Sequence, residues 1–100
     1  MLVELSNNAI ENLESIHSYI SEDSLHYADE FIDYIMNEIL ILEQFPRVGR
    51  MISEYQNKNV RELIRKEYRI IYEITGETNI LILAVCHSSR LLGNVLSIDT

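Results

Sequence analysis

Residues 60–74 have the sequence VRELIRKEYRIIYEI, whose pattern is the strongest indication of the fold. It contains two runs rich in β-branched and aromatic residues, Val60–Ile64 and Tyr68–Ile74, with only three residues between them. Such runs are typical of β-strands, and so short a connection is typical of a hairpin. A further run of this kind, Ile80–His87, follows after another short polar connection. These runs predict an antiparallel meander.

Two amphipathic helices are predicted upstream of the meander. Apolar residues recur at three- and four-residue spacing from Ala9 to about Ser21, and again from Ser24 to Phe45, where a proline follows. A short apolar run at Leu2–Leu5 suits a first strand. The order β, α, α, β, β, β predicts an α+β fold with a helical hairpin packed on an antiparallel sheet.

The composition is that of one globular domain, residues 1–100, with 47% hydrophobic residues and 24% charged residues. Cys86 is the only cysteine, so we interpret it as a packing residue in a reducing compartment. The start of the sequence has no signal-peptide pattern, and no apolar run reaches the roughly 18 residues of a membrane span. We therefore expect a cytoplasmic protein that does not contact membranes.

The charge is unevenly distributed along the chain. The formal net charge is −8, yet all eight Lys and Arg residues lie between Arg47 and Arg90, whereas the first 46 residues carry ten carboxylates and no basic residue. Such a chain can be acidic overall and still present one positive surface. The plainer alternative, a solvated acidic helical face, stays open at this point.

Pairing the predicted strands across their turns gives a candidate binding face. Centring the first turn on Lys66 sets Arg61 opposite Ile71, and centring the second on Thr78 sets Arg69 opposite His87. Arg61, Arg69 and His87 would then share the face turned away from the helices. Two guanidiniums and an imidazole there would suit a phosphate or a carboxylate.

Two alternatives compete with this arrangement. A second turn centred half a residue earlier would pair Arg69 with Cys86 instead of His87. The arginines could also form ordinary ion pairs with Glu62, Glu67 or Glu73, and His87 could be a hydrogen-bonded residue at a strand end.

Metal and cofactor chemistry finds little support in the sequence. His17 and His26 have no His, Cys or Asp partner at metal-ligand spacing, so no metal site is predicted. The sequence contains neither a Gly-rich phosphate loop nor a Gly-x-Ser-x-Gly motif. We therefore expect no cofactor.

Several motifs together resemble one family. They are Pro46-x2-Gly49-Arg50, Val60-Arg61-Glu62-Leu63, Tyr68-Arg69-Ile70-Ile71-Tyr72-Glu73 and His87-x2-Arg90. In this order they resemble the RelE/ParE toxins of type II toxin-antitoxin, or plasmid stabilisation, systems, over residues 2 to about 91. The resemblance implies a helical hairpin on an antiparallel sheet. It also implies a cognate antitoxin, encoded by a neighbouring reading frame as an acidic-tailed DNA-binding protein. The antitoxin's C-terminal segment wraps the toxin, and operator DNA is contacted only through the antitoxin.

The family includes two activities. RelE-like members are ribosome-dependent mRNA endoribonucleases. As a nuclease, this chain would use Arg69 to hold the scissile phosphate, His87 as the acid, Arg61 as a second phosphate contact and Glu54 as the base.

ParE-like members inhibit DNA gyrase, and here Arg61, Arg69, His87 and Arg90 would be target-binding residues. The His87-x2-Arg90 ending and the Pro46–Arg50 loop resemble the ParE side more, and the acidic composition is unfavourable for docking to the ribosome. We therefore predict a gyrase-directed toxin. A degenerate member that only binds its antitoxin is a third interpretation, and an apolar open face would favour a homodimer.

Overall fold

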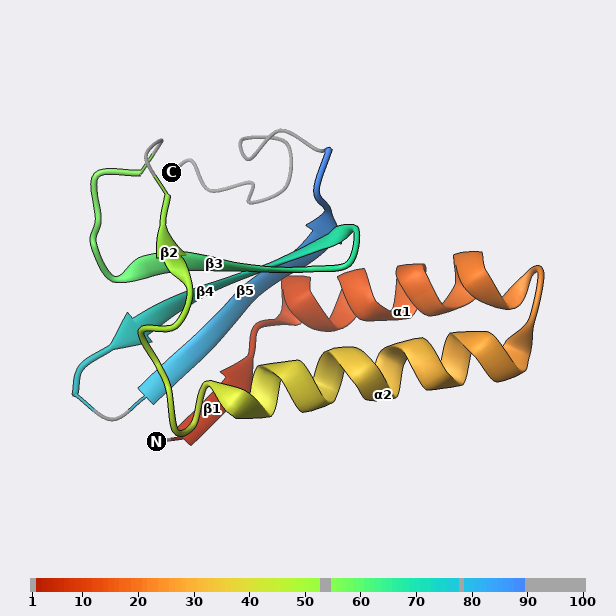
Figure 1. The fold of residues 1–100 in the computed structure, drawn as a ribbon, viewed down its shortest axis with the longest axis horizontal. Coiled ribbons are helices and arrows are strands. Elements are labelled where there is room, and N and C mark those ends of the chain that lie inside the picture. The colour runs from red at the N-terminus through yellow and green to blue at the C-terminus, as the bar shows by residue number, and fades with distance from the viewer. Residues whose placement is uncertain (1, 53–54, 78, 90–100) are drawn as a thin grey trace.

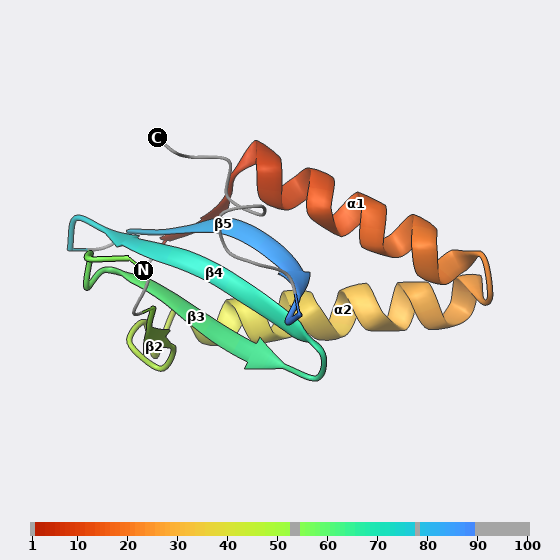
Figure 2. The ribbon, with the colours of Figure 1, turned by 90° about the horizontal axis from the view of Figure 1, so that it is seen from above.

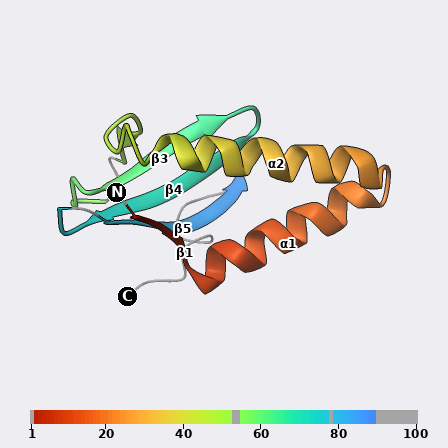
Figure 3. The same cartoon turned by 90° about the horizontal axis from the view of Figure 1, so that it is seen from below.

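The computed structural model describes residues 2–52, 55–77 and 79–89. Within them the elements are β1 (Leu2–Leu5), α1 (Asn7–Ser21), α2 (Leu25–Ile41), β2 (Arg50–Met51), β3 (Val60–Arg65), β4 (Tyr68–Thr75) and β5 (Asn79–His87). The two helices form one layer and the sheet forms the other (Figure 1). The hairpin end of the helices extends beyond the sheet, as the views from above and below both show (Figure 2, Figure 3). The predicted α+β fold is confirmed.

Serine side chains begin both helices. The Ser6 hydroxyl accepts a hydrogen bond from the Ala9 amide at 3.0 Å, and the Ser24 hydroxyl accepts one from the Tyr27 amide at 3.1 Å. These caps satisfy amides that have no partner within the first turn of a helix. The buried stripe of α2 then consists of Ala28, Phe31, Ile35 and Ile39.

The sheet has the strand order β1-β5-β4-β3-β2. Strands β3, β4 and β5 form the predicted antiparallel meander. β1 lies beside β5 and pairs with it in parallel, so the whole sheet is mixed. The sequence did not show this pairing, because the helical hairpin separates β1 from its partner.

The core lies mainly between the helices and the sheet. Its buried residues include Phe31 and Ile35 from α2, Ile70 and Tyr72 from β4, and Ile82 from β5. A smaller cluster on the other face comprises Ile52, Val60, Ile71, Ala84 and Cys86. Cys86 is thus buried among apolar neighbours, as expected of a packing residue. None of the helices in the described part of the chain is long and apolar enough to cross a membrane.

The first turn differs from the predicted register by one residue. Arg65 pairs with Tyr68, so the turn consists of two residues, and Lys66 adopts φ 56° within it. Two-residue hairpin loops favour positive φ, because that twist matches the twist of the strands. Arg61 consequently lies opposite Tyr72 and not opposite Ile71, which turns it toward the helical side.

Strand β5 contains a β-bulge, and beyond it the side chains that would point to one face of the sheet point to the other. The register shifts between Ile71 and Tyr72, so Ile71 pairs with Ala84 while Tyr72 pairs with Ile82, and Leu83 is the extra residue of a β-bulge. Beyond the bulge, Arg69 pairs with Cys86, and His87 pairs with Tyr68.

Side chains of the first helix satisfy the backbone at this bulge. The Leu83 carbonyl accepts hydrogen bonds from the Ser6 hydroxyl at 3.1 Å and from the side-chain amide of Asn8 at 2.9 Å. The Val85 amide donates to the Asn12 side-chain oxygen at 3.0 Å. The start of α1 therefore supplies the hydrogen bonds that β1 no longer provides to this part of β5.

Candidate functional site

The residues predicted to share one open face do not share it. Arg69 lies on the face away from the helices, together with Cys86. Arg61 and His87 lie on the helical side, opposite Tyr72 and Tyr68 respectively. The predicted constellation is therefore wrong, because of the two-residue turn and the bulge. Glu54 and Arg90, the remaining candidates, lie outside the described residues.

Arg69 belongs instead to an arginine–glutamate triad formed by Arg50, Glu62 and Arg69. The Arg69 Nε and Nη2 atoms lie 2.7 and 2.6 Å from Glu62 Oε1, and Arg50 Nε lies 2.7 Å from Glu62 Oε2. The Glu62 side chain is only 4% exposed and that of Arg69 12%, whereas that of Arg50 is 71% exposed. Both oxygens of one buried carboxylate are thus bound by guanidiniums. The plainer prediction, an ion pair of Arg69 with Glu62, is confirmed.

Strand pairing positions the triad. β2 is only two residues long, and it sets Arg50 opposite Glu62 on β3. Glu62 lies opposite Ile71 on β4, so Arg69 is its diagonal neighbour. The triad carries one excess positive charge, which Arg50 presents to solvent.

The loop before β2 is bound to the helical side of the sheet by Tyr72. The Tyr72 hydroxyl donates to the Pro46 carbonyl at 2.7 Å and accepts from the Gly49 amide at 3.0 Å. Arg61 Nη1 donates to the Gly49 carbonyl at 3.0 Å. A Cβ atom at Gly49 would lie 2.6 Å from the Tyr72 hydroxyl and 2.7 Å from the Glu62 carbonyl oxygen. Only glycine fits at position 49, and the closely packed loop places Arg50 beside Glu62.

His87 belongs to an aromatic cluster on the helical side. Its ring packs edge-on against Tyr68, with centroids 5.6 Å apart, and Tyr68 in turn lies 5.0 Å from Phe31 of α2. His87 Nδ1 lies 2.8 Å from the Ser89 hydroxyl, and Nε2 lies 3.5 Å from a carboxylate oxygen of Glu67. The imidazole is therefore a hydrogen-bonded residue at a strand end, on the opposite face of the sheet from the Arg69 guanidinium.

A protein-family model supports the resemblance seen in the motifs. The model describes the ParE toxin of the type II toxin-antitoxin system, parDE, and it matches residues 3–92. The chain belongs to the ParE toxin family. No curated protein sequence matches this family member.

Two solved structures share the fold of this ParE-family protein. A chain of the chromosomal ParDE system from P. aeruginosa matches with a TM-score of 0.70 and 20% identity, covering 87% of this chain and 95% of that one. A chain of the RelBE2 toxin-antitoxin complex from Mycobacterium tuberculosis matches with a TM-score of 0.64 and 22% identity, covering 86% and 95%.

The motifs that carry the family resemblance have a structural explanation in this ParE-family chain. Gly49 provides the close approach to Tyr72, Arg50 and Arg69 bind Glu62, and Arg61 holds the loop. Sequence reasoning missed the roles of Arg50 and Tyr72. The available signal was the Pro-x-x-Gly-Arg loop, since a glycine at a fixed place in a loop often marks a close backbone approach.

Three of the four exposed basic residues in the described part of this ParE-family chain lie between residues 47 and 58. Arg47 precedes β2, Arg50 belongs to it and Lys58 follows it, while the fourth exposed basic residue, Lys66, lies in the turn between β3 and β4. Nine of the 14 carboxylates among the described residues lie on or beside the two helices, between Glu11 and Glu43. Among the residues described, no group of His, Cys, Asp or Glu is arranged to hold a metal ion.

Alkaline pH is expected to weaken the loop contact. Burial raises the pKa of Tyr72 above its ordinary value of 10.0, and the Gly49 hydrogen bond, Arg61 and Arg47 lower it by smaller amounts. The folded state therefore keeps the phenolic proton at a pH where the unfolded chain has lost it. This contribution to stability is complete below about pH 10 and declines as the pH rises toward the folded pKa.

Thermal unfolding between about pH 9 and pH 11 tests this expectation. Tyr72→Phe should cost about 1–2 kcal/mol at neutral pH, through the lost hydrogen bonds, and should make the alkaline decline shallower. Burial also raises the pKa of Tyr68, so part of the decline should remain in the variant. If the stability of Tyr72→Phe fell as steeply with rising pH as that of the parent protein, the Tyr72 hydroxyl would not be the cause of the decline.

Proposed function

We propose that this ParE-family chain is a toxin that acts on DNA gyrase and is neutralised by a cognate antitoxin. The observation that carries the choice of target is the arginine–glutamate triad. Its buried carboxylate binds Arg69, the residue that a nuclease would use for the scissile phosphate. An arginine held in this way contributes to the fold of the sheet.

Ribonuclease activity of the RelE type is less well supported than gyrase inhibition. Cleavage needs a base, a cation and an acid that converge on one phosphate, and each acid or base group is typically worth about 10²–10⁴ in rate. Here Arg69 and His87 lie on opposite faces of the sheet. A single phosphate could not contact both side chains without a change in strand register.

The surface that suits an acidic region of the target is the positive segment with Arg47, Arg50 and Lys58. Arg50 is its fixed member, because Glu62 holds the guanidinium while 71% of the side chain stays exposed. A preorganised arginine loses little side-chain entropy on binding. We therefore propose Arg50 as a target contact in place of Arg61 and Arg69, which are engaged within the protein.

The antitoxin is part of the same proposal. The two solved structures compared above come from toxin-antitoxin systems, ParDE and RelBE2. A cognate antitoxin would bind this chain and would provide its only contact with operator DNA. The alternative of a degenerate antitoxin-binding module predicts the same partner but no effect on growth.

Inducible expression of the chain in a bacterial host tests the proposal. Thymidine incorporation should fall within minutes while amino-acid incorporation initially continues. His87→Ala should stay toxic, because the imidazole is not part of the proposed contact, whereas Arg50→Glu should lose toxicity. An early fall in amino-acid incorporation that His87→Ala abolishes would instead establish the nuclease.

A further inference from the structure

Arg61 is a partly buried cation whose hydrogen bonding is incomplete. Its Nε atom is buried and has no hydrogen-bond partner in the described part of the chain. Among the described residues, no carboxylate forms an ion pair with its guanidinium. A buried donor without a partner destabilises the folded state, and so does a partly buried charge without a counter-ion. The stability of the fold therefore does not explain a guanidinium at this position.

The hydrogen bond that Arg61 makes is to the backbone next to Arg50. Arg61 Nη1 donates to the Gly49 carbonyl at 3.0 Å. That carbonyl belongs to the peptide group between Gly49 and Arg50, and because a peptide group is planar, the contact fixes the orientation of the group from which Arg50 continues. The Tyr72 hydroxyl holds the preceding peptide group through the Gly49 amide, also at 3.0 Å. Both peptide groups of Gly49 are thus held by side chains of the sheet.

The short strand β2 depends on such contacts. It pairs with β3 through Arg50 and Met51 alone, so the ladder supplies few hydrogen bonds. Arg61 approaches this segment from the helical side, whereas Glu62 binds Arg50 Nε on the other face at 2.7 Å. Arg50 is therefore held at its backbone through Gly49 and at its guanidinium by Glu62, while its side chain stays exposed.

We propose that Arg61 is a positioning residue for Arg50. It does not contact the target itself, and it holds the peptide group between Gly49 and Arg50 so that the Arg50 guanidinium meets the target in one orientation. The inference rests on the proposed function, in which Arg50 is the target contact. A side chain that is already ordered loses less entropy on binding. The incomplete hydrogen bonding of Arg61 is thereby offset by a gain in affinity for the target.

Arg61→Met separates stability from target inhibition. The midpoint of thermal unfolding should stay within about 4 °C of the parent, because loss of the Gly49 hydrogen bond and removal of the unpaired buried donor act in opposite directions. The concentration of chain that half-inhibits gyrase supercoiling should nevertheless rise about 3- to 10-fold, the effect of ordering one long side chain during binding. Unchanged inhibition by a folded Arg61→Met protein would contradict the proposal.

A double-mutant cycle distinguishes positioning from direct contact. In an Arg50→Ala background the orientation of residue 50 no longer matters to the target, so Arg61→Met should change half-inhibition by less than about twofold. A further loss as large as that in the parent background would mean that Arg61 meets the target itself. That result would overturn the proposal.

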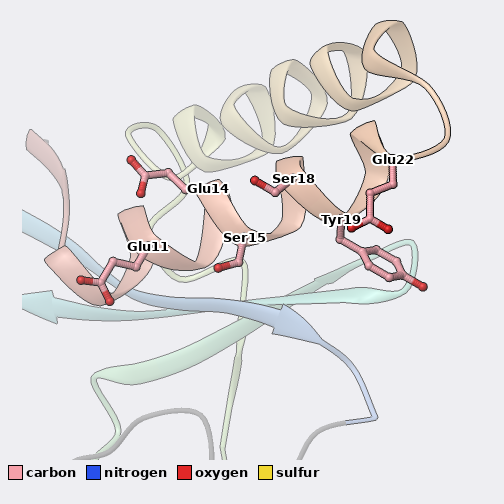
Figure 4. A pocket seen from close by; sticks show the side chains of 6 residues that line it. All are labelled: Glu11, Glu14, Ser15, Ser18, Tyr19 and Glu22. Atoms are coloured by element: carbon pink, nitrogen blue, oxygen red, sulfur yellow. The ribbon is translucent and has the colours of Figure 1, made fainter.

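Two control variants match Arg61→Met in charge. Arg65→Met removes an arginine of the same strand that binds Glu38 of α2, so it should lower the thermal midpoint and leave half-inhibition unchanged. Ser18→Asp adds one negative charge on the outer side of α1, where Ser18 lines a shallow groove formed by that helix alone (Figure 4). It should not alter inhibition. A loss in Ser18→Asp equal to that in Arg61→Met would reduce the effect to net charge and overturn the proposal.

Hydrogen exchange of the Arg50 Nε–H group tests the positioning without gyrase. Measured by ¹⁵N NMR on the full chain, its exchange with water should become about 3- to 10-fold faster in Arg61→Met and stay unchanged in Arg65→Met. Equal exchange in the parent and in Arg61→Met would overturn the proposal whatever the inhibition assay shows. A parent chain that does not inhibit gyrase would contradict the proposed function, while the exchange rate would still decide whether Arg61 positions Arg50.

Discussion

Replacing Glu62 with alanine is expected to lower the free energy of unfolding by about 3 kcal/mol. Removing one partner of a buried ion pair typically costs about 3–5 kcal/mol, and the exposure of Arg50 places this triad at the lower end. The Arg69 side chain, only 12% exposed, would lose the carboxylate that its Nε and Nη2 contact. Chemical denaturation followed by circular dichroism measures the loss.

Two further variants identify the cause of that loss. Glu67→Ala removes a carboxylate that is 81% exposed and should change stability by less than about 0.5 kcal/mol. Glu62→Leu combined with Arg69→Met should recover most of the loss, because an apolar pair of similar volume avoids the unpaired charge. A Glu62→Ala protein as stable as the parent would contradict the structural role of the triad.

Gly49→Ala is expected to destabilise the protein by about 2–3 kcal/mol. Overpacking typically costs about 1–3 kcal/mol, and here the new methyl group would also disturb both hydrogen bonds of the Tyr72 hydroxyl. The backbone oxygen of Glu62, 2.7 Å from the added atom, cannot move without disturbing β3. The free energy of unfolding and the resistance of the 46–51 loop to proteolysis should fall together.

A second glycine provides the comparison. Gly76→Ala places the methyl group where nothing lies within 4 Å, but at φ 64°. Its expected cost is about 1 kcal/mol, from backbone strain alone, with the 46–51 loop unaffected. Stability of Gly49→Ala equal to or above that of Gly76→Ala would contradict the close contact.

Much of the fold follows from periodicity and composition. The strand runs, the helical stripes and the Ser24 cap all appear where local patterns place them, because these patterns depend on neighbours in sequence. The parallel pairing of β1 with β5 could not be predicted in this way. It depends on how the helical hairpin returns the chain to the sheet, which is a property of tertiary packing.

The site was harder to predict, because a shift of one residue changes the face of a strand. Leu83 shows the difficulty: its neighbours in sequence are apolar, and nothing in Ile80–Val85 marks the bulge. The stabilising groups are Ser6, Asn8 and Asn12, far away in sequence. The bulge places His87 beside Tyr68 on the helical side. The predicted grouping of His87 with Arg69 assumed regular alternation of side chains along β5, so it is wrong.

The supercoiling activity of purified DNA gyrase, measured with increasing amounts of the purified chain, shows whether gyrase is the target. We expect dose-dependent inhibition that Arg50→Glu relieves and His87→Ala does not. In parallel, programmed ribosomes incubated with the chain should keep their mRNA intact. Undisturbed supercoiling together with mRNA cleavage that depends on Arg69 and His87 would contradict the account.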